Sequence, residues 1–331
     1  MQKATSEAVT TPTKTQSFKS IPVDHTIKSQ LEKLGLGKIR LPRQSKTEYG
    51  KQRDLSGYGE TGETPTSAYF PPSGCRLVAE ASDDAQFPAE GLPEVCFVGR
   101  SNVGKSSLLN AIVGYPLSKT SSKPGETTNL RWYNNSDLIT LVDLPGYGFS
   151  FAQENRSGVW MEAVKRYLQH RKSLKRCFIL IDSRQPLKRS DDSTMQFLEE
   201  SKVTYQLVLT KADLVGVGDL AKRVSQLQSS IKERFPHAVP DVLVVSSQNR
   251  SGLSLLRKQL ISLFNPERRE AFGRLRDKKF AAAERRRAKR AVQAEHQHQV
   301  ELHEQRRHSR RALMRQVRSD RKAAESRAPS L

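Results

Sequence analysis

Short apolar runs alternate with amphipathic segments between about residues 77 and 264. The runs are rich in Val, Ile, Leu and Phe, which favour strands; they are VCFVG, LITLVD, CFILID, YQLVLT and DVLVVSS. Segments between them, such as GDLAKRVSQLQSSIKERF, have a helical spacing of apolar residues. Because strands that are apolar throughout are buried on both faces, the pattern predicts an α/β domain. Its sheet would be mainly parallel, with roughly six strands and helices on both faces.

Both ends of the chain lack this alternation. Residues 1–73 are rich in Ser, Thr, Gly and Pro and predict an extended or disordered arm, in which HTIKSQLEKLG is the one helical candidate. From 274 to 328 there is neither Gly nor Pro, and the composition favours helix, but too few apolar residues are present to bury a face. We therefore divide the chain into an N-terminal arm (1–73), a domain (74–265) and a basic helical extension (266–331).

The charge of the chain favours a polyanionic partner. Lys and Arg number 56 against 35 Asp and Glu, a net charge of +21, and +11 of it lies in residues 266–331. Arginine side chains bind phosphate oxygens without reading sequence. We expect the extension to become ordered as a helix on RNA. A free solvated tail and a protein-binding helix are the alternatives.

Cysteine usage and hydropathy narrow the setting. Cys75, Cys96 and Cys177 show neither metal spacing nor a disulfide framework, which suits a reducing compartment. No apolar run approaches the roughly 18–20 residues that cross a bilayer, so we expect no membrane partner. The first twenty residues are rich in Ser, Thr and Lys with Glu7 as their one acidic residue, a weak likeness to an organelle transit sequence.

A glycine-flanked loop follows the first of the apolar runs and opens a helix. Residues 99–106, GRSNVGKS, match the pattern G-x-x-x-x-G-K-[ST]. The glycines let successive backbone N–H groups turn around phosphate oxygens, and the helix adds the positive end of its dipole. We expect Lys105 to reach the β- and γ-phosphates and the Ser106 hydroxyl to bind Mg²⁺. The residues expected around the phosphates are Gly99, Ser101, Asn102, Val103, Gly104, Lys105, Ser106 and Ser107.

Further motifs follow, each at the end of a predicted strand. LVDLPG places Asp143 where it can hold Mg²⁺ through water and leaves the Gly146 N–H for a γ-phosphate. LTKAD contains Thr210, Lys211 and Asp213. The Asp213 carboxylate can accept two parallel hydrogen bonds from N1–H and N2–H of guanine, a pairing that adenine cannot offer.

The last apolar run ends in two serines. Ser246 and Ser247 are expected to brace the edge of the base with their backbone N–H groups. Taken together, the phosphate loop and the three strand-end motifs predict a guanine-nucleotide site.

These motifs closely resemble the EngB (YihA-type) GTPases. The resemblance covers residues 93–264 and is carried by PEVCFVGRSNVGKSSLLNAI, TSSKPGETTNL, LVDLPGYG, IDSRQPLKRSD and LTKAD. It implies a phosphate-loop GTPase fold, Mg²⁺-dependent hydrolysis of GTP and a role in assembly of the large ribosomal subunit. It also implies that Thr127, in the P-G-x-T segment, joins Ser106 and Asp143 around the metal.

The residue after Gly146 is Tyr147, where Ras-type enzymes carry a glutamine that orients the attacking water. Stabilisation of the transition state must then come from elsewhere. The resemblance to potassium-dependent relatives implies that the Asn102 carbonyl oxygen holds K⁺ beside the β–γ bridge. In the alternative, Asn102 only closes the loop through a side-chain hydrogen bond. The candidate catalytic residues are Asn102, Lys105, Thr127 and Gly146.

The expectation is a GTPase assembly factor that docks on immature large-subunit rRNA in the GTP state and is released after hydrolysis. Its partners would be GTP and GDP, rRNA, and ribosomal proteins or other assembly factors, and it would act as a monomer. The alternatives are a nucleotide-stabilised module that bridges rRNA with little turnover, and a GTPase switch directed at proteins. The extensions resemble those of organellar members and favour the mitochondrion, with plastid and cytoplasm as alternatives.

Overall fold

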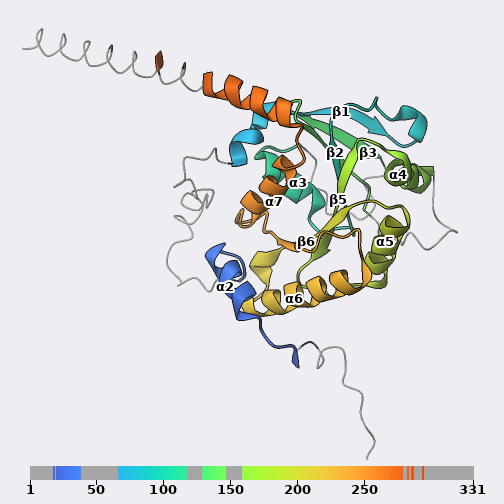
Figure 1. The fold of residues 1–331 in the computed structure, drawn as a ribbon, viewed down its shortest axis with the longest axis vertical. Coiled ribbons are helices and arrows are strands. Elements are labelled where there is room, and N and C mark those ends of the chain that lie inside the picture. Colours follow the sequence, from blue (N-terminus) through green and yellow to red (C-terminus); the bar gives the residue numbers. More distant parts are fainter. Residues whose placement is uncertain are drawn as a thin grey trace, which may run out of the picture. The chain divides into compact units, whose positions relative to one another are not determined.

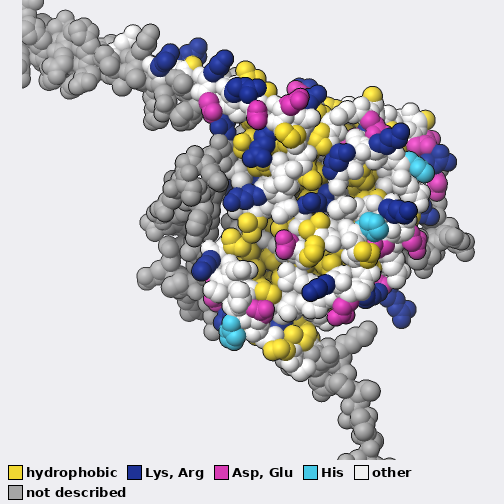
Figure 2. Space-filling model, in the orientation of Figure 1, with side chains coloured by type: hydrophobic (Ala, Val, Ile, Leu, Met, Phe, Trp, Pro, Cys, Tyr) yellow, Lys and Arg dark blue, Asp and Glu magenta, His cyan; other side chains and the backbone are white. Residues whose placement is uncertain are grey.

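The computed structural model describes residues 18, 20–38, 66–117, 129–146 and 159–278, and the single residues 282, 285, 286 and 293. The chain divides into two compact units, Met1–Asn265 and Pro266–Leu331. In the second unit, residues 266–278 are helical and mostly exposed. Figure 2 shows Lys and Arg side chains along these residues, with acidic side chains among them.

A seven-stranded sheet organises the first unit (Figure 1), in the order β1-β3-β4-β2-β5-β6-β7. Strand β3 is antiparallel to β1 and β4, and the other neighbouring pairs are parallel. The predicted α/β class with a mainly parallel sheet is confirmed, with one strand more than the roughly six expected. The strands are β1 (Cys75–Ala81), β2 (Glu94–Gly99), β3 (Leu130–Asn135), β4 (Ile139–Asp143), β5 (Leu174–Asp182), β6 (Tyr205–Thr210) and β7 (Leu243–Val244).

The five apolar runs correspond to β2, β4, β5, β6 and β7, whereas β1 and β3 have a different pattern. Edge strand β1 is buried only at its two ends, and Leu77 and Val78 in its middle are about half exposed. In β3, partly exposed polar residues interrupt the buried ones. A strand that is not buried on both faces needs no continuous apolar run, which is why the sequence pattern missed these two.

Helices cover both faces of the sheet, as predicted (Figure 1). On one face, α4 (Val159–His170), α5 (Arg189–Glu200) and α6 (Val217–Arg234) share a core with inward residues of the central strands, among them Cys96, Val98 and Ile179. The opposite face is covered by α3 (Lys105–Val113) and α7 (Leu253–Ile261), which pack against each other. Alternate residues of β2 therefore face different helix layers.

Part of the predicted N-terminal arm packs on the domain. Helix α2 (His25–Lys33) lies where the sequence offered its one helical candidate, and it is capped by Asp24, whose carboxylate accepts from two backbone N–H groups. It packs on α6, with Leu31 and Leu36 buried. Phe70, which follows the short helix η1 (Thr66–Tyr69), is also buried, with its ring 6.1 Å from that of Phe264. These segments differ from an extended arm because their few apolar residues gain burial in the domain core.

None of the helices in the described part of the chain combines the length and hydropathy that a membrane span needs.

A buried ion pair closes the amino end of the central strand. The Glu94 carboxylate at the start of β2 accepts from the Arg171 guanidinium at 2.6 Å and from the Tyr167 hydroxyl at 3.0 Å. The Arg171 and Glu94 side chains are 6% and 4% exposed. A buried charge is tolerated only when it is paired and hydrogen-bonded, so Arg171 is essential to the burial of Glu94.

Arg171→Met would leave the Glu94 carboxylate buried without its cation. We expect the free energy of unfolding to fall by roughly 3 kcal/mol or more, measured by chemical denaturation. Arg166→Met is the matched control. The Arg166 side chain is 53% exposed and pairs with Asp84 and Glu162 at the surface, so its loss should change stability little. Equal losses in the two variants would contradict this interpretation.

Candidate nucleotide-binding site

The predicted motifs meet at one edge of the sheet. Gly99, Asp143, Asp182 and Thr210 are the last residues of β2, β4, β5 and β6, and these strands pair in parallel. In such a sheet, ligands bind outside the carboxyl ends of the strands. Residues that are far apart in the sequence therefore lie within reach of one ligand.

The loop from β2 to α3 has the backbone shape that the phosphate motif requires. Asn102 and Gly104 adopt left-handed conformations, with φ of +61° and +103°, and α3 begins at Lys105. Gly99 has no room for a side chain, since a Cβ there would lie 2.9 Å from the Leu180 carbonyl oxygen. Asparagine is one of the few non-glycine residues that adopt positive φ readily. The conformation gives a reason for Asn102 that is independent of any bound cation.

Lys105 and Asp143 form a buried pair beneath this loop. The Lys105 ammonium donates to Asp143 Oδ1, and the two side chains are 9% and 0% exposed. The second carboxylate oxygen, Oδ2, is buried and has no hydrogen-bond partner among the described residues. An unsatisfied buried carboxylate oxygen is costly, and a bound cation or its water would satisfy it.

The metal prediction fits this arrangement in part. Ser106 follows Lys105 in the first turn of α3 and is partly exposed. Its hydroxyl and the Asp143 carboxylate are oxygen groups of the kind that Mg²⁺ prefers, and they would hold the ion when it is bound. Thr127, the third expected ligand, lies outside the described residues. Its place near the metal stays a prediction.

Gly146 lies against the phosphate loop. A Cβ at this position would be 3.3 Å from the Gly99 carbonyl oxygen and 3.4 Å from the Ser101 amide nitrogen. The chain after β4 therefore passes close to the loop that follows β2. The sequence motif predicts that the Gly146 N–H binds a phosphate there. Tyr147 lies outside the described residues.

The end of β6 is tied to the phosphate loop. The Thr210 hydroxyl donates to the backbone carbonyl of Val103 at 2.7 Å, and the Lys211 ammonium donates to the backbone carbonyl of Asn102 at 2.5 Å. Lys211 itself has a left-handed backbone, with φ of +57°. These bonds fix the distance between the predicted phosphate subsite and the predicted base subsite.

Asp213 lies in the short helix η5 (Ala212–Leu214) and is held by Ser246. The Ser246 hydroxyl donates to Asp213 Oδ1 at 2.6 Å. The Ser246 N–H donates to the Ser251 carbonyl at 3.0 Å, so it is not directed at the base as the sequence suggested. Ser246 thus acts through its hydroxyl, by orienting the carboxylate. Ser247, the other expected brace, is half-buried in the same turn.

Comparison with known proteins agrees with this arrangement. A family model described as a 50S ribosome-binding GTPase matches residues 94–211. A probable GTP-binding protein EngB from Bartonella quintana is 41% identical over 184 residues, which cover 53% of this chain and 85% of that protein. One from Anaplasma phagocytophilum is 41% identical over 188 residues, covering 56% of this chain and 97% of that protein.

The chain belongs to the EngB family of GTP-binding proteins. As an EngB GTPase it binds GTP and GDP and hydrolyses GTP. A solved structure of a probable GTP-binding protein engB aligns with 51% of this chain and 97% of its own, with a TM-score of 0.37 and 18% identity, which is too low to add to the assignment.

The sequence interpretation of this EngB GTPase missed Asp182 as a site residue. Its carboxylate lies 2.9 Å from the Lys211 ammonium and 2.7 Å from the Arg184 guanidinium. Partial burial alone would raise the pKa of Asp182, but hydrogen bonds from Arg184 and Lys211 outweigh burial and hold that pKa well below its usual range. Asp182 therefore stays ionised and positions Lys211. The signal in the sequence is the carboxylate that ends the apolar run CFILID.

Asp213→Asn tests the base assignment in this EngB protein. The amide would present a donor to the N1–H and N2–H donors of guanine. We therefore expect the affinity for GDP to fall by roughly 100-fold. The ratio of the affinity for xanthosine diphosphate to the affinity for GDP should rise. Fluorescent nucleotide titrations measure both. Asp219→Asn, an exposed residue of α6, makes the same change in charge nearby and should leave both affinities unaltered. An unchanged preference in Asp213→Asn would contradict the assignment.

Proposed function

We propose that this EngB GTPase is an assembly factor for the large ribosomal subunit. In its GTP state it docks on immature rRNA, and after hydrolysis it is released. The family model's description as a 50S ribosome-binding GTPase over residues 94–211 carries this proposal. That range contains the phosphate loop, the buried Lys105–Asp143 pair and Lys211, so the ribosome-linked family model covers the predicted phosphate subsite.

The proposed chemistry follows from the chain's own groups. The amides of residues 99–106 and the Lys105 ammonium bind the phosphates, and this ammonium neutralises charge that develops on the transferred group. Ser106, Asp143 and Thr127 would hold Mg²⁺, which supplies further positive charge when bound. Thr127 and Gly146 would contact the γ-phosphate only before hydrolysis, and these contacts would distinguish the GTP state from the GDP state.

The basic extension is proposed to contact rRNA. Residues 266–331 carry +11 of the net charge, and the described residues 266–278 form an exposed helix. Arginine and lysine side chains on such a helix suit phosphate oxygens of folded RNA. We further propose that the protein acts as a monomer on the particle. We also propose that it acts in the mitochondrion, on the basis of its added extensions and its Ser/Thr/Lys-rich first residues.

Co-sedimentation with large-subunit precursors tests the proposal. We expect the full-length protein to pellet with the particle in a non-hydrolysable GTP analogue and to stay in the supernatant with GDP. Because phosphate contacts by the extension are electrostatic, binding should also fall steeply with added salt. Binding that is equal in both nucleotides would favour a module that bridges rRNA. Binding in neither would favour a switch directed at proteins.

The proposed K⁺ role of Asn102 has a separate test. Since the backbone at Asn102 has φ of +61°, Asn102→Gly removes the side-chain carbonyl while keeping the conformation accessible, and Asn102→Ala would add strain. We expect wild-type turnover of GTP to be roughly tenfold or more faster in KCl than in NaCl, and Asn102→Gly to lose this difference. Equal rates in both salts for the wild-type protein would contradict the cation role. So would K⁺ stimulation that persists in Asn102→Gly.

A further inference from the structure

Residues 35–38, which we call the strap, form hydrogen bonds with two loops: the one after β6, which contains Asp213, and the one after β7. The Lys38 N–H donates to the Val215 carbonyl at 2.7 Å, two residues after Asp213. The Ser251 hydroxyl donates to the Gly35 carbonyl at 3.0 Å, across 216 positions of sequence. The strap therefore bonds to the loop after β6 and to the loop after β7.

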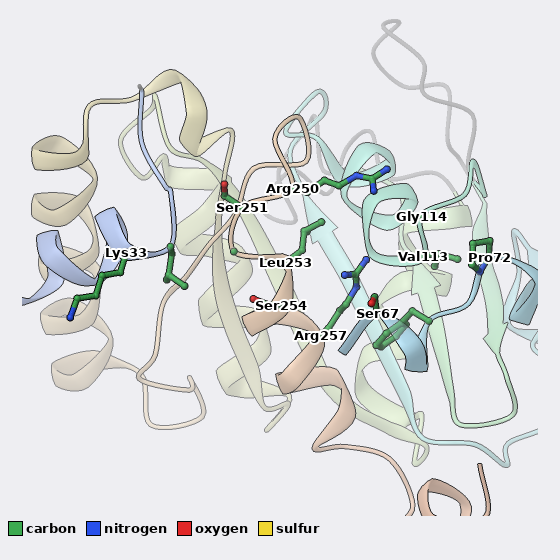
Figure 3. Close-up of a pocket in the computed structure, with 13 residues that line it drawn as sticks. Lys33, Ser67, Pro72, Val113, Gly114, Arg250, Ser251, Leu253, Ser254 and Arg257 are labelled. Atoms are coloured by element: carbon green, nitrogen blue, oxygen red, sulfur yellow. The ribbon is translucent and has the colours of Figure 1, made fainter. Parts of the chain in front are cut away.

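The second of these loops leads directly to the Asp213 carboxylate. The Ser251 carbonyl accepts the Ser246 N–H, and the Ser246 hydroxyl donates to Asp213 Oδ1 at 2.6 Å. Ser251 is thus linked to Asp213 by two hydrogen bonds, both made by Ser246. Figure 3 shows Ser251 beside the N-terminal segment, while Arg250 points to the opposite side.

The strap is itself held in one place. Leu36 is 3% exposed, and its N–H donates to the Leu31 carbonyl at the end of α2. Gly37 has φ of +100°, and a Cβ on it would lie 2.8 Å from Val217 Cγ2 at the start of α6. Burial of Leu36 and the close approach of Gly37 fix the register of the strap against α6.

A cavity of about 240 Å³ lies next to Leu34, the residue before the strap, and its lining includes Ser251, Gly252 and Leu253 (Figure 3). The strap itself is connected to the two loops by its hydrogen bonds with Val215 and Ser251.

We propose that the strap is a positioning element for recognition of the guanine base. It holds Val215 and Ser251, and through Ser246 it holds the Asp213 carboxylate where it can meet both N1–H and N2–H of guanine. The inference rests on the assignment of Asp213 to the base, which belongs to the proposed nucleotide chemistry. A segment that only stabilised the fold would lower the melting temperature without changing which base is preferred.

The test compares GDP with inosine diphosphate, which lacks the 2-amino group of guanine. Two variants of the full-length protein disturb the strap: Gly37→Val, which drives a side chain into Val217, and Ser251→Ala, which deletes one hydroxyl. We expect the affinity for GDP divided by the affinity for inosine diphosphate to fall by roughly tenfold in Gly37→Val and by a smaller factor in Ser251→Ala. The reason is that a displaced Asp213 carboxylate makes a weaker contact with N2–H, which only GDP offers.

Ser262→Ala is the matched control. Its hydroxyl also donates to a backbone carbonyl, that of Gln259 at 2.7 Å, at the end of α7. We expect an unchanged affinity ratio in this variant. Ser251→Ala carries the test if Gly37→Val does not fold, since it only removes a hydrogen bond.

A ratio that stays at the wild-type value in both strap variants would overturn the inference, whether or not their melting temperatures fall. The Asp213→Asn variant separates this failure from a wrong base assignment. If Asp213→Asn changes the ratio and the strap variants do not, the strap alone is refuted. If Asp213→Asn also leaves the ratio unchanged, the base assignment and the inference that rests on it are both wrong.

Discussion

The backbone turn between β2 and α3 is the constraint on which the nucleotide site depends. A strand that is buried throughout must pass into a helix within five residues, and it does so through left-handed conformations at Asn102 and Gly104. Lys105, at the first position of the helix, reaches back to the buried Asp143. A turn of this shape before a helix N-terminus is where backbone amides can bind a phosphate. A residue that could not adopt positive φ at these positions would misplace both the amides and the ammonium.

Long-range contacts extend this local geometry into a complete site. Thr210 and Lys211 bond to carbonyls of the phosphate loop from more than a hundred positions away. Asp182 neutralises Lys211, and Ser246 orients Asp213. These contacts come from the carboxyl ends of three neighbouring strands, β5, β6 and β7. The parallel sheet therefore places the phosphate and base subsites next to each other at one edge.

The sequence alone predicted those features that local chemistry determines. Strands buried on both faces show as apolar runs, and the phosphate loop shows as glycine spacing. Strands β1 and β3 were missed because partial exposure leaves them without a continuous apolar run. The prediction that the Ser246 N–H meets the base was wrong, since this N–H donates to the Ser251 carbonyl. That bond depends on how the following turn folds, which the sequence pattern does not reveal. The packing of Leu31 and Leu36 against the domain could not be predicted from a polar segment in which few apolar residues occur.

The central claim is that residues 99–106 hold the phosphates of a guanine nucleotide with Lys105 as their cation. Calorimetric titration of GDP into the full-length protein with Mg²⁺ tests it most directly, with Lys105→Met compared at a temperature where circular dichroism shows the variant to be folded. The account predicts one GDP bound per wild-type chain and a large loss of affinity in the variant. No heat of binding in the wild-type protein, or equal affinity in the folded variant, would contradict it.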